Sequence, residues 1–415
     1  MGSNPASQND AVMGQEAPTG ESARLHYLDW LRILATLGVF LFHTMLPFDA
    51  SIDWMIDNAE RSEVVTALRL FIFQWGMPLF FLLAGASSWF ALRRRTGRQF
   101  AGERFRRLVV PFAISTILFA PFQTYLQAIH KGWSDWYAGP FLNLAYFGAY
   151  LDSRLGPDLG ELLNPRVFIN YGSHLWFVGH LFVFSLCLLP LFLWLKKEAG
   201  KRFISWLAGL CEKRGGILVA ILPLAVIRII LQPKFPEYTD WADFFFMLVF
   251  FVSGYILFAD ARFTRVIRRD GKLVLAAGVI STVVVYAAHF SGLGKIWLAS
   301  PGTAGFYFTW GVLSTVAWCW VIIMLYVGMS FLDFTNRWLE YGQEAIMPFY
   351  MFHHPAIVVI AFYVVQWNAA ILVKLPVIIL GSFLVPLGLT EIVRRIKPVR
   401  ALFGMKPRRV STDPV

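Results

Sequence analysis

The sequence is poor in charge and in cysteine. Asp, Glu, Lys and Arg make up only 15% of its 415 residues, whereas soluble domains average about 25%. Its three cysteines, Cys187, Cys211 and Cys319, are scattered and show neither metal-ligand nor redox spacing. Hydrophobic residues reach 57%, and the mean hydropathy is +0.57. This composition excludes an ordinary soluble domain and predicts an all-α polytopic membrane protein, because the apolar runs have the length of helical spans.

The N-terminal region lacks the basic start and the apolar core of a signal peptide. Its Gly, Ser, Pro and Asn content predicts a disordered tail over residues 1–28. A basic tail is expected over residues 395–415. Between the two tails we predict a single transmembrane domain, residues 29–394.

Long polar stretches are also missing between the apolar runs, ten of which approach the ~20 residues that a span needs. The net charge of +11 is concentrated in alternate loops, mainly 93–107, 196–214 and 260–272. This alternation predicts that both termini are cytoplasmic, and it explains the basic residues without nucleic acid. The predicted spans are 29–48, 65–92, 108–129, 174–195, 215–232, 242–259, 273–290, 304–332, 345–367 and 370–393.

The first span carries Asp29, Arg32 and His43, which a plain membrane anchor does not need. On a helix, Arg32 and His43 fall within about 20° of each other and about 16 Å apart along the axis. Each residue has a simpler explanation: Asp29 as a helix cap, Arg32 as a snorkelling side chain, His43 as a hydrogen-bonded core histidine. Because a mid-bilayer charge costs roughly 2.5–3.5 kcal/mol, the three together predict a functional polar face.

Two further spans contain histidines. His180 follows Trp176 by one helical turn, and His353 and His354 are adjacent. At 1.5 Å per residue, His43, His180 and His354 reach a similar depth, so we expect them to cluster. No carboxylate-rich pattern accompanies them, and no metal is predicted.

The loop after the second span holds seven arginines in fifteen residues, 93–107. Topology alone favours a basic loop, but this density exceeds what orientation needs, and such a cluster can bind phosphate groups. On the opposite side, an acidic loop from Asp49 to Glu63 predicts a solvated segment. The aromatic residues of segment 130–173 predict an interfacial belt, with sugar stacking as the alternative.

Five motifs occur in order along the chain. They are the Arg-x10-His of Arg32 and His43, Pro78-Leu-Phe-Phe-Leu-Leu-Ala-Gly85, the Arg-x-x-Arg of Arg104 and Arg107, His174-Leu-Trp-Phe, and Tyr350-Met-Phe-His353-His354-Pro. Together they resemble the acyltransferase 3 family of integral membrane acyltransferases, over about residues 28–397. Within this family, the doubled His353-His354 is most similar to the glucan succinyltransferase branch.

The resemblance implies transfer of an acetyl or succinyl group from cytoplasmic acyl-CoA to a hydroxyl of an extracytoplasmic carbohydrate or lipid-linked glycan. It implies acetyl-CoA or succinyl-CoA as donor, no metal, and a place in the bacterial inner membrane. The expected partners are membrane lipid, acyl-CoA and a carbohydrate acceptor, with no nucleic acid. A homodimer is compatible with the sequence.

The expected roles combine chemistry with the resemblance. A neutral imidazole is a suitable base for a sugar hydroxyl, so His43 is the candidate catalytic base, with a histidine-bound acyl group as the alternative. Arg32 is expected to hold the thioester or stabilise developing charge, while Arg104 and Arg107 hold CoA phosphates. The expected supporting or substrate-binding residues are Asp29, Trp176, His180, His353 and His354.

A transporter or flippase for a polar or glycan substrate is the main alternative, because intramembrane charges and broken helices also line transport pathways. The two halves of the sequence show no shared motif order, and the deepest ionisable residues are His and Arg rather than Asp or Glu. A membrane sensor or scaffold is a third alternative, which leaves the polar face of the first span unexplained.

Overall fold

The computed structural model describes residues 25–133, 150 and 159–405. Over these residues the chain is helical and has no strand, apart from one isolated bridge between Asp49 and Ser62. Parts of three predicted segments lie outside the described residues: 1–24 of the tail over 1–28, 406–415 of the tail over 395–415, and 134–149 and 151–158 of the aromatic segment 130–173.

The prediction of about ten spans is confirmed. In the described part of the chain, nine helices or pairs of consecutive helices are long and apolar enough to cross a membrane. A tenth span arises if one bent pair, α10 (Glu198–Cys211) followed by Gly216–Leu231, counts as a span. The nine are α1 (His26–Met45), α2 (Glu63–Arg94), α3 (Gly97–Arg104) with α4 (Val110–Lys131), α7 (Val167–Gly172) with α8 (Trp176–Cys187), α12 (Trp241–Ala259), α13 (Ala261–Phe290), α15 (Ala304–Phe331), α16 (Arg337–Val364) and α17 (Ile371–Arg395).

One predicted span and one predicted loop differ in detail. Span 174–195 is interrupted twice. A 3-10 turn, η4 (Ser173–Leu175), precedes α8. A new helix, α9 (Leu189–Leu195), then begins with Pro190 in its first turn, where the missing backbone N–H of proline is tolerated. The expected loop 196–214 contains the amphipathic helix α10, which meets the following segment at 119°. Phe203 and Trp206 are exposed on α10, as in a helix that lies along a membrane surface.

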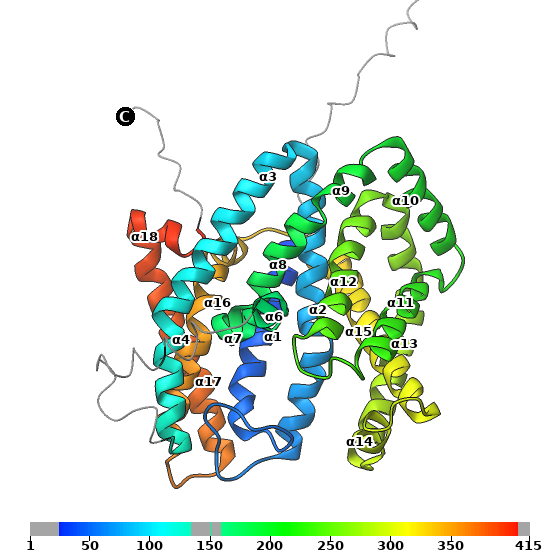
Figure 1. Cartoon of the computed structure of the whole chain (residues 1–415). Coiled ribbons are helices and arrows are strands. Elements are labelled where there is room, and N and C mark those ends of the chain that lie inside the picture. Colours follow the sequence, from blue (N-terminus) through cyan, green and yellow to red (C-terminus); the bar gives the residue numbers. More distant parts are fainter. Residues whose placement is uncertain (1–24, 134–149, 151–158, 406–415) are drawn as a thin grey trace, which may run out of the picture.

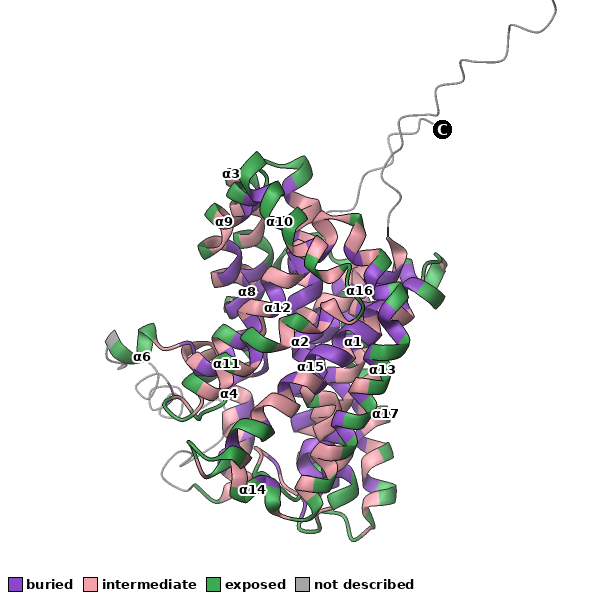
Figure 2. Ribbon diagram, turned by 90° about the vertical axis from the view of Figure 1, so that its right-hand side faces the viewer, coloured by how far each residue is buried: buried purple, intermediate pink, exposed green. Residues whose placement is uncertain are grey.

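Helix α16 lies at the centre of the bundle. In its most apolar stretch 72% of the residues are buried, against 22% for α13 and for α17, whose outward turns are exposed or half-buried (Figure 2). Helices α2 and α12 approach closely through two glycines, Gly85 and Gly254. A Cβ on Gly85 would lie 1.9 Å from the Phe251 carbonyl oxygen, and one on Gly254 would lie 1.9 Å from that of Leu82. Small residues thus allow the two backbones to touch.

The bundle has two distinct ends (Figure 1). The start of α1, α3, α10 and α18 (Lys397–Leu402) gather at one end, which we call the basic end. The loop between α1 and α2, residues 49–62, and α14 (Leu293–Leu298) lie at the opposite end, the loop end. The cytoplasmic placement of the basic end stays a prediction from its charge.

Candidate active site

Four histidines from three segments meet inside the bundle: His43 of α1, His174 of η4, and His353 and His354 of α16. The ring centroids of His43 and His354 are 4.8 Å apart, and those of His174 and His354, which stack, are 4.6 Å apart. His353 lies 5.2 Å from both His43 and His174. We call these four residues the histidine cluster.

Tyr350 attaches η4 to α16 and so brings His174 to the cluster. The Tyr350 hydroxyl donates to the His174 carbonyl oxygen at 2.8 Å, and the Tyr350 carbonyl oxygen accepts from His174 Nε2 at 3.2 Å. The preceding Ser173 has a left-handed φ of 51°, a costly conformation for a residue with a Cβ. Such local strain is typical of positions that the surrounding fold holds for a function.

The hydrogen bonds around His43 and His353 define their tautomers. Since a carbonyl only accepts, His353 Nδ1 donates to the Tyr350 carbonyl oxygen, at 2.7 Å. A neutral His353 then has a lone pair on Nε2, which accepts from His43 Nδ1 at 3.2 Å. His43 Nδ1 also lies 2.9 Å from the Val39 carbonyl oxygen, which can only accept. His43 Nε2 is therefore the unprotonated nitrogen, the state that a general base requires.

A second contact fixes His354. Gln123 is buried, and its Nε2 donates to the Phe119 carbonyl oxygen at 3.1 Å, so its Oε1 is the atom that faces His354. His354 Nδ1 donates to this oxygen at 2.5 Å. The lone pair of His354 consequently lies on Nε2.

The cluster forms part of the wall of a cavity of about 590 Å³ that extends toward the loop end. We call it the histidine cavity. Its size is within the range of small-molecule sites. The described residues include no group of three or more His, Cys, Asp or Glu with the geometry of a metal centre. Residues on the wall include His43, His174, His354, Trp176, Tyr238, Tyr350, Ser51, Trp54 and Arg69.

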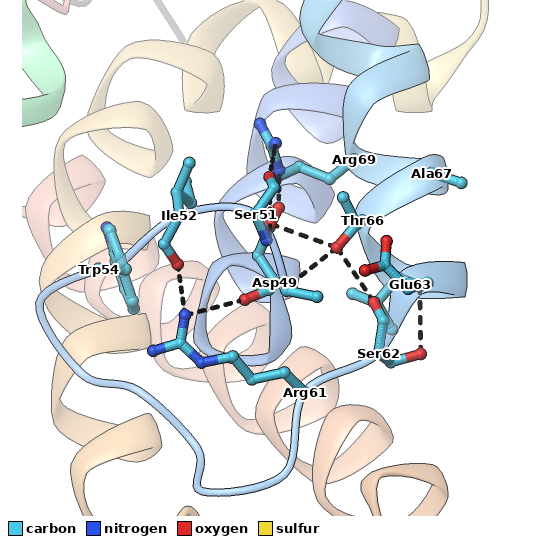
Figure 3. A network of polar contacts seen from close by, with 12 residues as sticks. Asp49, Ser51, Ile52, Trp54, Arg61, Ser62, Glu63, Thr66, Ala67 and Arg69 are labelled. Atoms are coloured by element: carbon cyan, nitrogen blue, oxygen red, sulfur yellow. Dashed lines mark hydrogen bonds and ion pairs between the residues drawn. The ribbon is translucent and has the colours of Figure 1, made fainter. Parts of the chain in front are cut away.

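Arg69 is the only Lys, Arg, Asp or Glu among the described residues on this wall. It is 4% exposed and forms an ion pair with Asp49, and its Nη2 donates to Ser51 Oγ at 3.2 Å (Figure 3). Its guanidinium lies over the rings of Phe42 and Phe73, at 5.6 and 5.9 Å. Arg69 is not among the site residues predicted from the sequence, although an arginine inside a predicted span is the signal that identified Arg32.

Asp53, Glu60 and Glu63 are exposed, as expected for a solvated loop, but Asp49 is fully buried. Burial by itself raises the pKa of its carboxyl, but hydrogen bonds from Ser51 and the charge of Arg69 outweigh this and leave the pKa below its ordinary value. Arg61 donates to the carbonyl oxygens of Asp49 and Ile52 and closes the loop (Figure 3). The loop thus forms a folded cover over the cavity at the loop end.

Arg32 and Arg104 lie toward the basic end and bond adjacent serines of α2. Arg32 Nη2 donates to Ser87 Oγ at 2.7 Å, and Arg104 Nη2 donates to Ser88 Oγ at 3.0 Å. Asp29 pairs with Arg32 at 2.5 Å. The structure therefore brings Asp29, Arg32 and Arg104 together.

Arg107 lies apart from this group. It pairs with Glu103 at 3.2 Å, and its side chain is 43% exposed. Glu103 also pairs with Arg95 at 3.1 Å, so this carboxylate holds two guanidiniums of the basic loop.

His180 does not join the histidine cluster, contrary to the depth estimate. Its Nε2 donates to the Pro165 carbonyl oxygen at 3.1 Å, and its ring packs on Trp176 and Phe244. The estimate failed because span 174–195 is not one regular helix that crosses the membrane. His174, quoted above only as part of a motif, occupies the place expected for His180.

Comparison with known proteins agrees with this architecture. The profile of the acyltransferase 3 family, described as an acyltransferase domain, matches residues 25–391. Curated relatives named Glucans biosynthesis protein C, from Salmonella paratyphi A, Salmonella agona and Salmonella dublin, are 24% identical over 401 residues. The aligned region is 92% of this chain and 95% of theirs. No solved structure matches significantly.

Proposed function

Because this chain belongs to the acyltransferase 3 family of multi-pass membrane proteins, we propose that it transfers an acetyl or succinyl group from cytoplasmic acyl-CoA to a hydroxyl of an extracytoplasmic carbohydrate. It would thus be an O-acyltransferase of the bacterial inner membrane. The name of the curated relatives supports a glucan as acceptor. The observation that carries the proposal is the unprotonated Nε2 of His43 on a cavity wall.

His43 acts as the general base. The acceptor hydroxyl oxygen forms a bond to the thioester carbonyl carbon while its proton passes to His43 Nε2. The C–S bond then breaks, and the CoA sulfur accepts that proton from His43 Nε2, so that CoA leaves as the thiol. His353 stabilises the charged His43 ring through the hydrogen bond from His43 Nδ1. The alternative is covalent, with the acyl group carried on His43 Nε2 before it reaches the acceptor.

Arg32 and Arg104 bind the phosphates of the donor. Arg32 is roughly 16 Å from His43 along α1, so its guanidinium is far from the reacting carbonyl. This spacing favours phosphate binding over the thioester contact expected from sequence. The extended arm of CoA between its diphosphate and its thioester would bridge the distance to His43. Asp29 positions Arg32, and Arg107 attracts the donor from the exposed rim.

Arg69 favours succinyl over acetyl. Asp49 offsets its charge, but a succinyl carboxylate can still accept hydrogen bonds from the guanidinium N–H groups that do not bond Asp49 or Ser51, whereas the methyl group of an acetyl cannot. Asp49 and Ser51 hold the Arg69 side chain at the cavity wall. The finer assignment of the acyl group therefore rests on this side chain.

The test is transfer by the purified full-length protein from succinyl-CoA or acetyl-CoA to a glucan oligosaccharide, followed by mass spectrometry of the glycan. His43→Gln should abolish transfer, whereas His180→Gln, outside the cluster, should retain it. Transfer by a folded His43→Gln protein would reject the base role. A hydroxylamine-sensitive acyl group on the wild-type protein, retained in the absence of acceptor, would favour the covalent route.

The transporter alternative makes a different prediction. The bent pair α10 with Gly216–Leu231 and the interrupted segment before α8 are the kind of broken helices that transport pathways use. Reconstituted vesicles that accumulate glycan without acyl-CoA, and show no acyl transfer, would support it against the enzyme.

A further inference from the structure

A second cavity, of about 440 Å³, adjoins the first between α2, α12, α13, α14 and α15. We call it the lateral cavity. Most of its wall is apolar and consists of side chains from α2, α12, α13 and α15. They include Met77, Met247, Val284, Leu313 and Ala317.

Charged side chains also line the lateral cavity. Arg228 pairs with Asp243 at 2.6 Å and lies over the rings of Phe246 and Trp310; this pair is largely buried and adds no net charge. His289 lines the cavity too and lies 3.8 Å from the Glu63 carboxylate. Lys295 on α14 is exposed toward the loop end, and no hydrogen bond or ion pair among the described residues engages its ammonium group. Of the Lys, Arg, Asp and Glu side chains on the described wall, Lys295 is therefore the one without an ion-pair partner.

The two cavities share part of their walls. Four side chains line both of them: Leu70, Phe73, Met77 and Tyr238. Tyr238 is 37% exposed, and the next residue, Thr239, has a left-handed φ of 64° and donates its N–H to Asp243 Oδ2 at 2.7 Å. Within the described residues, Thr239 and Ser173 are the two non-glycine residues with positive φ. Ser173 precedes His174 and Thr239 follows Tyr238, and both His174 and Tyr238 line a cavity.

We propose that the lateral cavity binds an anionic lipid of the membrane, with one apolar chain between α2 and α15 and the phosphate at Lys295. An apolar chain gains from burial against the methionine, valine and leucine side chains, whereas the hydroxyls of a soluble sugar would lose hydrogen bonds there. The cation on α14, followed by Trp297, is the pairing found where lipid headgroups meet protein. The bound chain contacts Phe73 and Tyr238 and so supports the wall of the histidine cavity.

The experiment titrates the delipidated full-length protein with phosphatidylglycerol and, separately, phosphatidylcholine of the same chains, using native mass spectrometry. Phosphatidylglycerol should bind at one site with about tenfold higher affinity. Val284→Trp fills the cavity and should abolish that site. Val283→Trp is the matched control, because Val283 is 61% exposed and does not line the cavity. Lys295→Glu should remove the headgroup preference, and Lys295→Arg should keep it.

Unchanged binding in Val284→Trp, equal losses in Val283→Trp, or equal affinity for the two lipids would overturn the proposal. If Val284→Trp does not fold, Leu313→Trp fills the same cavity from α15. The readout is binding rather than turnover. Lipid binding without acyl transfer would count against the proposed function alone, and transfer without lipid binding would count against this inference alone.

Discussion

His43 Nδ1 lies 3.2 Å from His353 Nε2, across 310 positions of sequence. Since His353 donates its other nitrogen to the Tyr350 carbonyl oxygen, this contact assigns the proton to His43 Nδ1. The Val39 carbonyl oxygen, 2.9 Å from the same nitrogen, requires the same proton. The base nitrogen of α1 is thus set by its own helix together with a residue of α16, which makes His353 a positioning residue.

Replacing His353 should lower kcat and leave KM for the donor unchanged. His353→Leu removes one of the two acceptors near His43 Nδ1 and leaves only the Val39 carbonyl oxygen. A hydrogen bond to a charged group is worth about 1.5–3 kcal/mol. We expect kcat to fall about 10- to 100-fold. His353→Gln, whose side-chain oxygen can accept the same proton, should recover part of the loss. Equal rates for the two variants in steady-state assays would contradict this role.

Donor binding should distinguish Arg104 from Arg107. Arg104 bonds Ser88 beside Arg32, whereas Arg107 is paired with Glu103 at the rim. Calorimetric titration with succinyl-CoA, acetyl-CoA and free CoA should show affinity about 10-fold or more lower in Arg104→Ala. The loss in Arg107→Ala should be smaller. A larger loss in Arg107→Ala would place the phosphate site at the rim instead.

Arg69 should control the choice of acyl group. Arg69→Gln combined with Asp49→Asn removes the charge without leaving an unpaired buried carboxylate. The ratio of kcat/KM for succinyl-CoA to that for acetyl-CoA should fall about tenfold or more, because a charge-assisted hydrogen bond is lost. An unchanged ratio in a folded double variant would show that the carboxylate binds elsewhere.

The Asp49–Arg69 pair should make stability depend on acid pH. The pKa of Asp49 is lower in the folded protein than its ordinary value, so its contribution is present above the unfolded-state pKa of about 3.9 and is lost as pH falls through the lower folded pKa. Asp49→Asn should cost about 3–5 kcal/mol at pH 7, because Arg69 loses its partner. Thermal unfolding should show this difference shrinking below about pH 4. Asp53→Asn is the control, since Asp53 is 82% exposed.

The glycines between α2 and α12 should resist substitution. A Cβ on Gly85 or Gly254 would overlap a backbone carbonyl, so each change to Ala should destabilise the protein by about 1–3 kcal/mol or more. Gly311 in α15 is the matched control, because a Cβ added there would have no neighbouring atom within 4 Å. Gly311→Ala should therefore be neutral or stabilising. Equal melting temperatures for all three variants would contradict close contact of α2 with α12.

Much of the fold was predictable from the sequence because a membrane span is a local property. Hydropathy identified the spans, and helical periodicity placed Arg32 and His43 on one face. A helix can also be broken inside an apolar segment, and the mean hydropathy of that segment does not reveal the break. The interruptions around α8 and the helix in segment 196–214 escaped prediction for this reason.

The membrane class, the family motifs and the polar face of the first span could be read from the amino-acid sequence. The packing of distant segments set three other features: His174 rather than His180 meets His43, Arg69 and Asp49 form a buried pair, and Tyr238 lines both cavities. The two groups differ in the range over which each signal acts. Periodicity and hydropathy act over one helix, whereas a site built from several helices depends on where each is broken and which backbones touch.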